Sequence, residues 1–201
     1  MSVAPAAAES STAVRMQTFV HPISQIDAAN LARFGGKATG LARMAGAGIR
    51  VPPAFVIGTD GYRAFRAAAG ELPEALIAQV RNAMQQLEAA TGRRFGGGSD
   101  SADAKAPLLV SVRSGAQVSM PGMMDTVLNL GITAPGALCL ARETGNPGFA
   151  LDTWLRFWRM FSDIVLGLDA DALIAALAPS IDAARAHTTP EPFDRLEQAI
   201  V

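Results

Sequence analysis

The chain has 201 residues, half of them apolar, and its 17 lysines and arginines nearly balance 18 aspartates and glutamates, for a formal net charge of −1. That apolar content suffices for a buried core, and the charge balance argues against a nucleic-acid or anionic-membrane surface as the main function. One cysteine, Cys139, excludes an internal disulfide, and two histidines disfavour a histidine-rich metal site.

The start of the sequence and its hydropathy give no sign of export or membrane insertion. Residues 1–15 lack the continuous apolar stretch of a signal peptide. No window of about 18 uncharged apolar residues occurs. We therefore expect a soluble cytoplasmic protein, with residues 1–17 forming a flexible arm.

The next segments predict short strands that alternate with helices. A strand over 18–21 is expected to end at Pro22. The pair Gly35-Gly36 interrupts a helical pattern, so a helix is expected to begin near Lys37 and to close at Gly46 to Gly48. Ala54–Ile57 predicts a buried strand, since it follows two prolines that favour extended backbone.

Two helices and a loop follow in the sequence. Thr59 is predicted to cap a helix that runs to Gly70. Pro73 stands at a first-turn position of a longer helix. Gly92–Ala106 is rich in glycine, serine and aspartate and predicts a loop.

The second half of the chain predicts two more strands and a helical extension. Leu108–Val112 reads as a buried strand and Thr126–Leu130 as another. Asn146-Pro147 begins a long helix that ends at Gly167, and its aromatic stripe is expected to face the core: Trp154, Trp158 and Phe161. Cys139 is expected to be a small buried apolar residue in an alanine- and leucine-rich helix. His21 and His187 show no neighbouring acid–base group.

These elements predict an α/β (α+β) protein. A small mixed sheet with flanking helices is expected over 18–131, and a helical subdomain over 132–201.

The first candidate site is the glycine turn before Lys37. Gly35 and Gly36 allow close approach of the backbone to a ligand, and a lysine in the first turn adds charge to a helix N-terminus that already favours anions. This is not a Walker A loop, because Leu31 replaces its first glycine and Ala38 follows the lysine. The alternative is a glycine turn whose lysine lies in solvent.

The second candidate is Arg113-Ser114, at the end of a predicted strand and before a glycine. Ligands gather at strand ends in α/β folds, and the planar fork of arginine suits phosphate oxygens. The alternative is an arginine paired with a neighbouring carboxylate.

The third candidate is the methionine-rich segment 119–126, which contains Gly122 and Met123. Thioethers around a Pro-Gly turn suit a surface that closes over a flat apolar group such as a nucleobase. Asp125 and Thr126 either touch phosphate-bound Mg²⁺ or anchor the turn. A loop folded under the core is the alternative.

These segments resemble, in order and spacing, the N-terminal nucleotide-binding region of the pyruvate, phosphate dikinase family. The resemblance covers roughly residues 30–168 and is carried by these stretches: Gly35-Gly36-Lys37-Ala38, Val51-Pro52-Pro53, LVSVRSGAQVSMPGMMDTVLNLG at 109–131, and Trp158-Arg159-Met160-Phe161. Related dikinases and phosphoenolpyruvate synthases typically carry an acidic loop after the arginine, so the methionines favour the pyruvate, phosphate dikinase branch.

The resemblance implies the N-terminal half of an ATP-grasp nucleotide site, in which Lys37 and Arg113 contact the ATP phosphates. The second half of that site, which supplies the acidic Mg²⁺ ligands, and the phosphohistidine and pyruvate domains have no counterpart in these 201 residues. His187 lacks the Thr-Ser-His context of the phosphorylated histidine. We therefore expect no metal site in the chain itself, and no residue is assigned with certainty as catalytic.

Three functions follow as hypotheses. The first is an ATP-binding portion of a dikinase-like phosphotransferase, incomplete for catalysis alone and aided by a second polypeptide or a homo-oligomer. The second is a non-catalytic interaction or regulatory paralogue that keeps the fold and binds a partner protein. A self-sufficient kinase is disfavoured, because Asp125 is the only carboxylate near the proposed site.

Overall fold

The computed structural model describes residues 17–97, 104–115 and 125–172, and also residues 174, 175, 178 and 181. Its helices and strands confirm the α/β class. In chain order they are β1 (Val20–Pro22), α1 (Leu31–Gly46), β2 (Phe55–Ile57), α2 (Thr59–Ala67), α3 (Glu74–Thr91), β3 (Val110–Arg113), β4 (Thr126–Leu130), α4 (Ala134–Thr144) and α5 (Pro147–Phe161). Residues 1–16 of the arm expected over 1–17 lie outside the described residues.

The strands pair as two separate antiparallel sheets. In the first, β1 lies against β2, with His21 opposite Val56. In the second, β3 lies against β4, with Arg113 opposite Thr126 and a register shift between Val110 and Val112. One parallel bridge joins Phe95 to Leu108. In place of the one mixed sheet expected, the described residues form two separate antiparallel pairs and this isolated parallel bridge.

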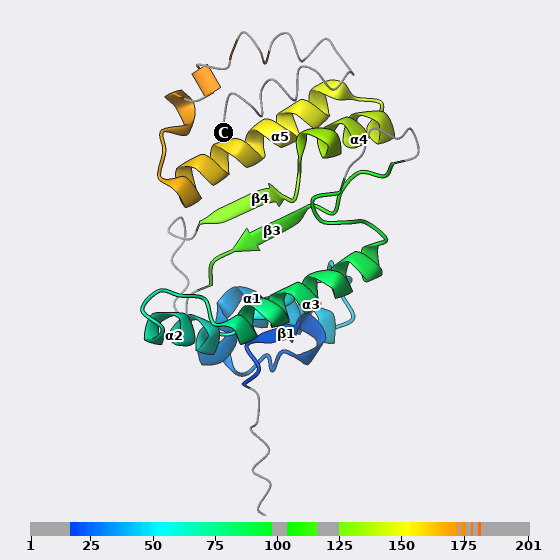
Figure 1. The fold of residues 1–201 in the computed structure, drawn as a ribbon. Helices are drawn as coiled ribbons and strands as arrows, with labels where there is room; N and C mark the ends of the chain where they lie inside the picture. The colour runs from blue at the N-terminus through cyan, green and yellow to red at the C-terminus, as the bar shows by residue number, and fades with distance from the viewer. Residues whose placement is uncertain are drawn as a thin grey trace, which may run out of the picture.

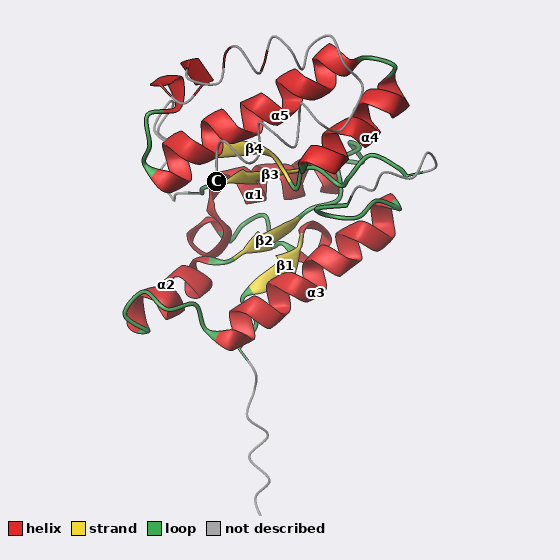
Figure 2. Ribbon diagram, turned by 45° about the horizontal axis from the view of Figure 1, so that its top comes forward, coloured by secondary structure: helices red, strands yellow, loops and turns green. Residues whose placement is uncertain are grey.

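The β3–β4 hairpin forms a middle layer of the molecule. Helices α4 and α5 cover one side of it, and α1, α2, α3 and the β1–β2 pair lie on the other (Figures 1 and 2). The strand end that carries Arg113 therefore reaches toward the part of the chain that contains the glycine turn.

The start of α5 follows its local sequence signals. The Asn146 side chain accepts a hydrogen bond from the Phe149 backbone N–H at 3.0 Å, and Pro147 occupies the first turn. After Phe161 the helix continues as a π-helical turn over Ser162–Leu166, and Gly167 ends it with a left-handed φ of 66°. The predicted helix from Asn146 to Gly167 is confirmed.

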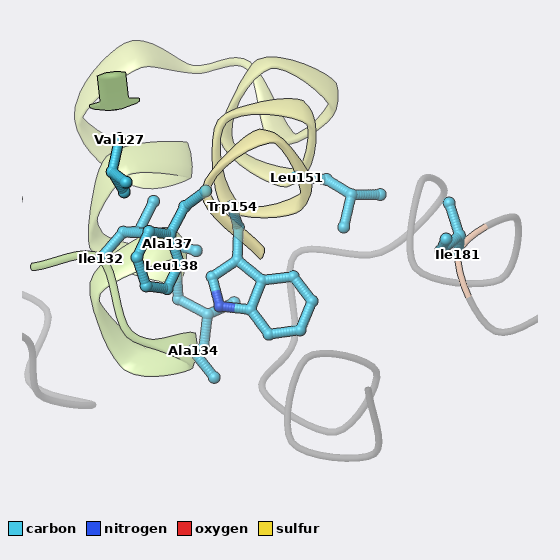
Figure 3. Packing of buried hydrophobic residues seen from close by; sticks show 9 residues of the cluster. Val127, Ile132, Ala134, Ala137, Leu138, Leu151, Trp154 and Ile181 are labelled. Carbon is cyan, nitrogen blue, oxygen red and sulfur yellow. The ribbon is translucent and has the colours of Figure 1, made fainter. Parts of the chain in front are cut away.

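The larger core lies between β4, α4 and α5. Trp154, Leu151 and Leu138 are fully buried there (Figure 3). The Trp154 ring meets the Trp158 ring edge-on at 6.2 Å. The aromatic stripe is thus part of the core, and Cys139 is buried, both as predicted. Because Val127 of β4 packs in the same cluster as the helices, the core includes residues on both sides of residue 131. The domain division there stays a prediction.

Two strands are more exposed than expected. The strand predicted at 108–112 begins at Val110, and the Val112 side chain is 50% exposed. Ile57 at the end of β2 is 48% exposed. Each sheet has only two strands, and exposure does not alternate along β3, where Ser111, Val112 and Arg113 are all exposed.

The helix-capping role predicted for Thr59 is wrong. Helix α2 begins at Thr59 itself, and its N-cap is Gly58. The Thr59 hydroxyl instead donates a hydrogen bond to the Ala32 carbonyl at 3.0 Å. The residue therefore ties α2 to the first turn of α1.

A polar network joins the end of α3 to α4. The Arg93 guanidinium forms a two-pronged salt bridge with Glu143 and donates to the Ala106 carbonyl at 2.9 Å. The Ala106 N–H in turn donates to Glu143 at 3.1 Å. The hydrogen bonds from Arg93 hold the pKa of Glu143 below its usual value. These contacts tie the chain at Arg93 to the chain at Ala106, on either side of the segment between them.

In the described part of the chain, no helix combines the length and the apolar character that a membrane span requires.

Candidate functional site

The glycine turn predicted before Lys37 is present in α1. Gly35 has φ 74° and ψ 164°, a conformation that essentially only glycine adopts, and helical geometry resumes after it. The buried Thr39 hydroxyl donates to the Gly35 carbonyl at 3.0 Å and the Gly36 carbonyl at 3.2 Å. The first N–H groups of a helix have no partners within it, which is the general basis of anion binding at a helix N-terminus.

Lys37 and Arg113 are both exposed cations. Lys37 lies in the first turn after Gly35, and Arg113 is the last residue of β3. No salt bridge joins either side chain to a carboxylate among the described residues. The sequence alternative of an Arg113–carboxylate pair therefore finds no support in this part of the chain.

The structure brings the two motifs together across the fold. A Cβ built on Gly115 would lie 4.0 Å from the Phe34 carbonyl oxygen, so the strand end after Arg113 runs beside the turn before Lys37. The Ser114 N–H and hydroxyl both donate to the Asp125 carbonyl at 3.3 Å. The candidate residues in the hairpin, Arg113, Ser114, Asp125 and Thr126, therefore gather at the hairpin end that adjoins Phe34. Gly122 and Met123 lie outside the described residues.

The described residues do not fit a metal held by the protein. Among them, no three histidine, cysteine, aspartate or glutamate side chains group together. The two hydrogen bonds from Ser114 reach the backbone carbonyl of Asp125 rather than its carboxylate. No chemical step is therefore assigned to a protein-bound Mg²⁺ at these residues.

A polar cluster beside the glycine turn was not anticipated from sequence. The Arg33 Nη2 atom lies 3.1 Å from Asp60 Oδ2 and 3.3 Å from His21 Nε2. His21 has no acid–base group beside it in the sequence, but the fold brings Arg33 and Asp60 to it. Burial and then the Arg33 charge lower the pKa of His21. Arg33 stands 12 residues from His21 and 27 from Asp60, so no local pattern could have signalled the cluster.

Replacing Gly35 with alanine is expected to destabilise the protein by about 1–3 kcal/mol, because its backbone conformation is strained for any residue with a Cβ. Gly40→Ala on the same helix is the matched control. A Cβ there meets no atom within 4 Å, so alanine should stabilise the protein by about 0.5–1 kcal/mol. Urea unfolding of both variants measures the difference, and equal stabilities would show that Gly35 is not strained.

Comparison with known proteins relates this chain to the pyruvate, phosphate dikinase family. Residues 31–91 match the family model described as pyruvate phosphate dikinase, AMP/ATP-binding domain. The pyruvate, phosphate dikinase of Rhizobium meliloti (strain 1021) is 44% identical over 137 residues, and that of Entamoeba histolytica is 43% identical over 150 residues. Pyruvate, phosphate dikinase 2 of Zea mays is 43% identical over 134 residues.

The matches cover most of this chain but only a small part of each relative. They cover 68%, 75% and 67% of this chain but 15%, 16% and 14% of the respective relatives. The chain thus matches about 15% of the length of these curated relatives.

Proposed function

The chain carries the AMP/ATP-binding domain of the pyruvate, phosphate dikinase family, and from this premise we propose that it binds ATP, with Lys37 and Arg113 as the phosphate contacts. The observation that carries the proposal is the approach of Gly115 to the Phe34 carbonyl, 4.0 Å from a Cβ built on Gly115. It sets a strand end with an exposed arginine beside a glycine turn with an exposed lysine.

The chemistry of both segments suits a polyphosphate. Backbone N–H groups at the restart of α1, after Gly35 and Gly36, donate to phosphate oxygens, and the Lys37 ammonium adds a point charge. The Arg113 guanidinium donates two parallel hydrogen bonds to one phosphate group. Such donors offset the charge that builds up on phosphate oxygens during phosphoryl transfer.

The remaining candidate residues take supporting roles in this proposal. Ser114 and Thr126 add hydroxyl groups near the phosphates, and the segment with Gly122 and Met123 covers the nucleotide. Asp125 is the one carboxylate of the candidate set, so we propose that the acidic ligands of nucleotide-bound Mg²⁺ come from residues outside this set, including those of a partner polypeptide. Participation in a dikinase-type phosphotransfer in the cytoplasm is part of the same proposal.

Saturating MgATP should raise the thermal midpoint of the native chain by several degrees. Ligand at about 100 times its dissociation constant adds roughly 2.7 kcal/mol to the stability, because it binds the folded state alone. The double variant Lys37→Ala/Arg113→Ala should lose most of that rise, which differential scanning fluorimetry measures.

The matched control is the double variant Lys105→Ala/Arg156→Ala, which likewise removes one lysine and one arginine charge, but from exposed positions outside the candidate site. It should keep the full midpoint rise with MgATP. A native chain without any rise would contradict the proposal and favour the partner-binding alternative. An equal loss in both double variants would show that net charge, rather than these two residues, governs binding.

A further inference from the structure

Arg33 lies just before the glycine turn, and its side chain contacts three other segments of the chain. Its Nη2 atom donates to the Thr18 carbonyl at 3.2 Å and to Asp60 Oδ2 at 3.1 Å. The same atom lies 3.3 Å from His21 Nε2. One guanidinium therefore links α1 to the residues before β1, to β1 itself and to α2.

The contact with Arg33 favours a neutral His21. The His21 Nε2 lies 3.3 Å from Arg33 Nη2, which can only donate, so in this contact the ring nitrogen is an acceptor and the neutral ring carries its proton on Nδ1. The ring is 8% exposed and meets the Phe34 ring edge-on at 5.1 Å. The groups that face it are Arg33 from α1, Asp60 from α2, and the Thr18 carbonyl. Burial and the Arg33 charge, which outweigh the opposite effects of Asp60 and the Thr18 hydrogen bond, lower the pKa of His21 and favour this neutral form.

These contacts converge on the residues that precede Gly35. The Arg33 guanidinium carbon also lies 5.4 Å from the centre of the Phe34 ring, and Phe34 is itself buried. The Thr59 hydroxyl donates a hydrogen bond to the carbonyl of Ala32, the residue before Arg33. The Phe34 carbonyl is the group that the Arg113 segment approaches at Gly115. The cluster therefore fixes the point from which the glycine turn departs.

We infer that Arg33 is a positioning residue for the nucleotide site: with Asp60 and neutral His21, it holds the Phe34–Gly35 turn in the conformation that receives phosphate. This role rests on the proposed binding of ATP. Arg33 acts through the turn, and the contacts to phosphate belong to Lys37, Arg113 and the backbone.

Substitution of Asp60 distinguishes a positioning role from a purely electrostatic effect on binding. Removal of a carboxylate near an anion site strengthens anion binding if charge alone matters. Loss of the Asp60–Arg33 pair weakens binding if the pair holds the turn, because affinity falls in proportion to the population of the competent conformation. Arg33→Lys provides a second separation, because it keeps the charge but loses the planar fork that reaches several acceptors.

The test is isothermal titration of the 201-residue chain with MgATP near 15 °C, about the temperature of maximum stability of most proteins. Asp60→Asn and Arg33→Lys should each bind about tenfold more weakly than the native chain, as expected when the competent turn falls to about a tenth of the population. Glu71→Gln removes an equal charge from an exposed position just after α2 and should bind within about twofold of native.

Circular dichroism confirms that each variant is folded, and either variant decides alone if the other does not fold. If a folded Asp60→Asn or Arg33→Lys binds MgATP as tightly as the native chain, or more tightly, the positioning role is overturned while the proposed function stands. A native chain that binds no MgATP overturns the proposed function and this role with it.

Discussion

Replacing Trp154 with alanine is expected to lower the free energy of unfolding by about 3–5 kcal/mol. The Trp154 side chain is fully buried between α4, α5 and β4, where neighbouring apolar groups surround it (Figure 3). Truncation removes the contact of its ring with Trp158 and leaves a cavity that a rigid core fills only in part. Since whole domains are stable by about 5–15 kcal/mol, this one change should bring the protein close to unfolding.

Chemical denaturation of Trp154→Ala beside Phe149→Ala measures the effect. Phe149 belongs to the same helix but is 50% exposed, so its truncation should cost about 1 kcal/mol or less. Comparable losses in the two variants would contradict a core centred on Trp154.

Gly131→Ala is expected to destabilise the protein by about 2–5 kcal/mol, the sum of backbone strain and overpacking. Gly131 follows β4 with a left-handed φ of 101°. A Cβ there would lie 2.7 Å from the Leu108 carbonyl oxygen and 2.7 Å from two atoms of the Phe95 ring. The oxygen belongs to the backbone of the Phe95–Leu108 bridge, so it cannot move aside without disturbing that bridge.

Gly145→Ala is the matched control for this clash. Gly145 also has a left-handed φ, at 64°, but a Cβ there meets no atom within 4 Å. Its replacement should therefore show the strain alone, about 1–2 kcal/mol. Urea unfolding of both variants gives the difference, and an equal loss would show that the close approach at Gly131 contributes nothing.

Elements with local signals were predictable from the sequence. The strand at Thr126–Leu130 has the predicted bounds, and the helix after Asn146 begins where its capping asparagine and proline indicate. The exposure of Val112 and the bridge between Phe95 and Leu108 were not predictable, because they depend on which segments pair across the fold. The mistaken cap at Thr59 has the same origin, since its hydroxyl is taken by a carbonyl of α1.

The candidate site shows the same division. The break at Gly35 and the helix through Lys37 follow from the glycine pair and its spacing. The approach of the Arg113 segment to Phe34 is a long-range contact, and only the family resemblance had suggested that the two motifs act together. The links from Arg33 to His21 and Asp60 could not be anticipated, because the three residues lie on different elements and each is unremarkable in its own segment.

The network around Arg93 has a consequence for how this protein tolerates change in length. Arg93 donates to the Ala106 carbonyl, and the Leu108 N–H donates to the Arg94 carbonyl at 2.8 Å. These two hydrogen bonds keep residues 93–94 close to residues 106–108, and neither depends on the residues that connect them. Closing a longer flexible connection costs only about 0.6 kcal/mol for each doubling of its length. Extra residues inserted between Gly97 and Ala104 should therefore leave the remaining fold in register, which makes this junction a natural place to splice in a peptide tag or a reporter domain.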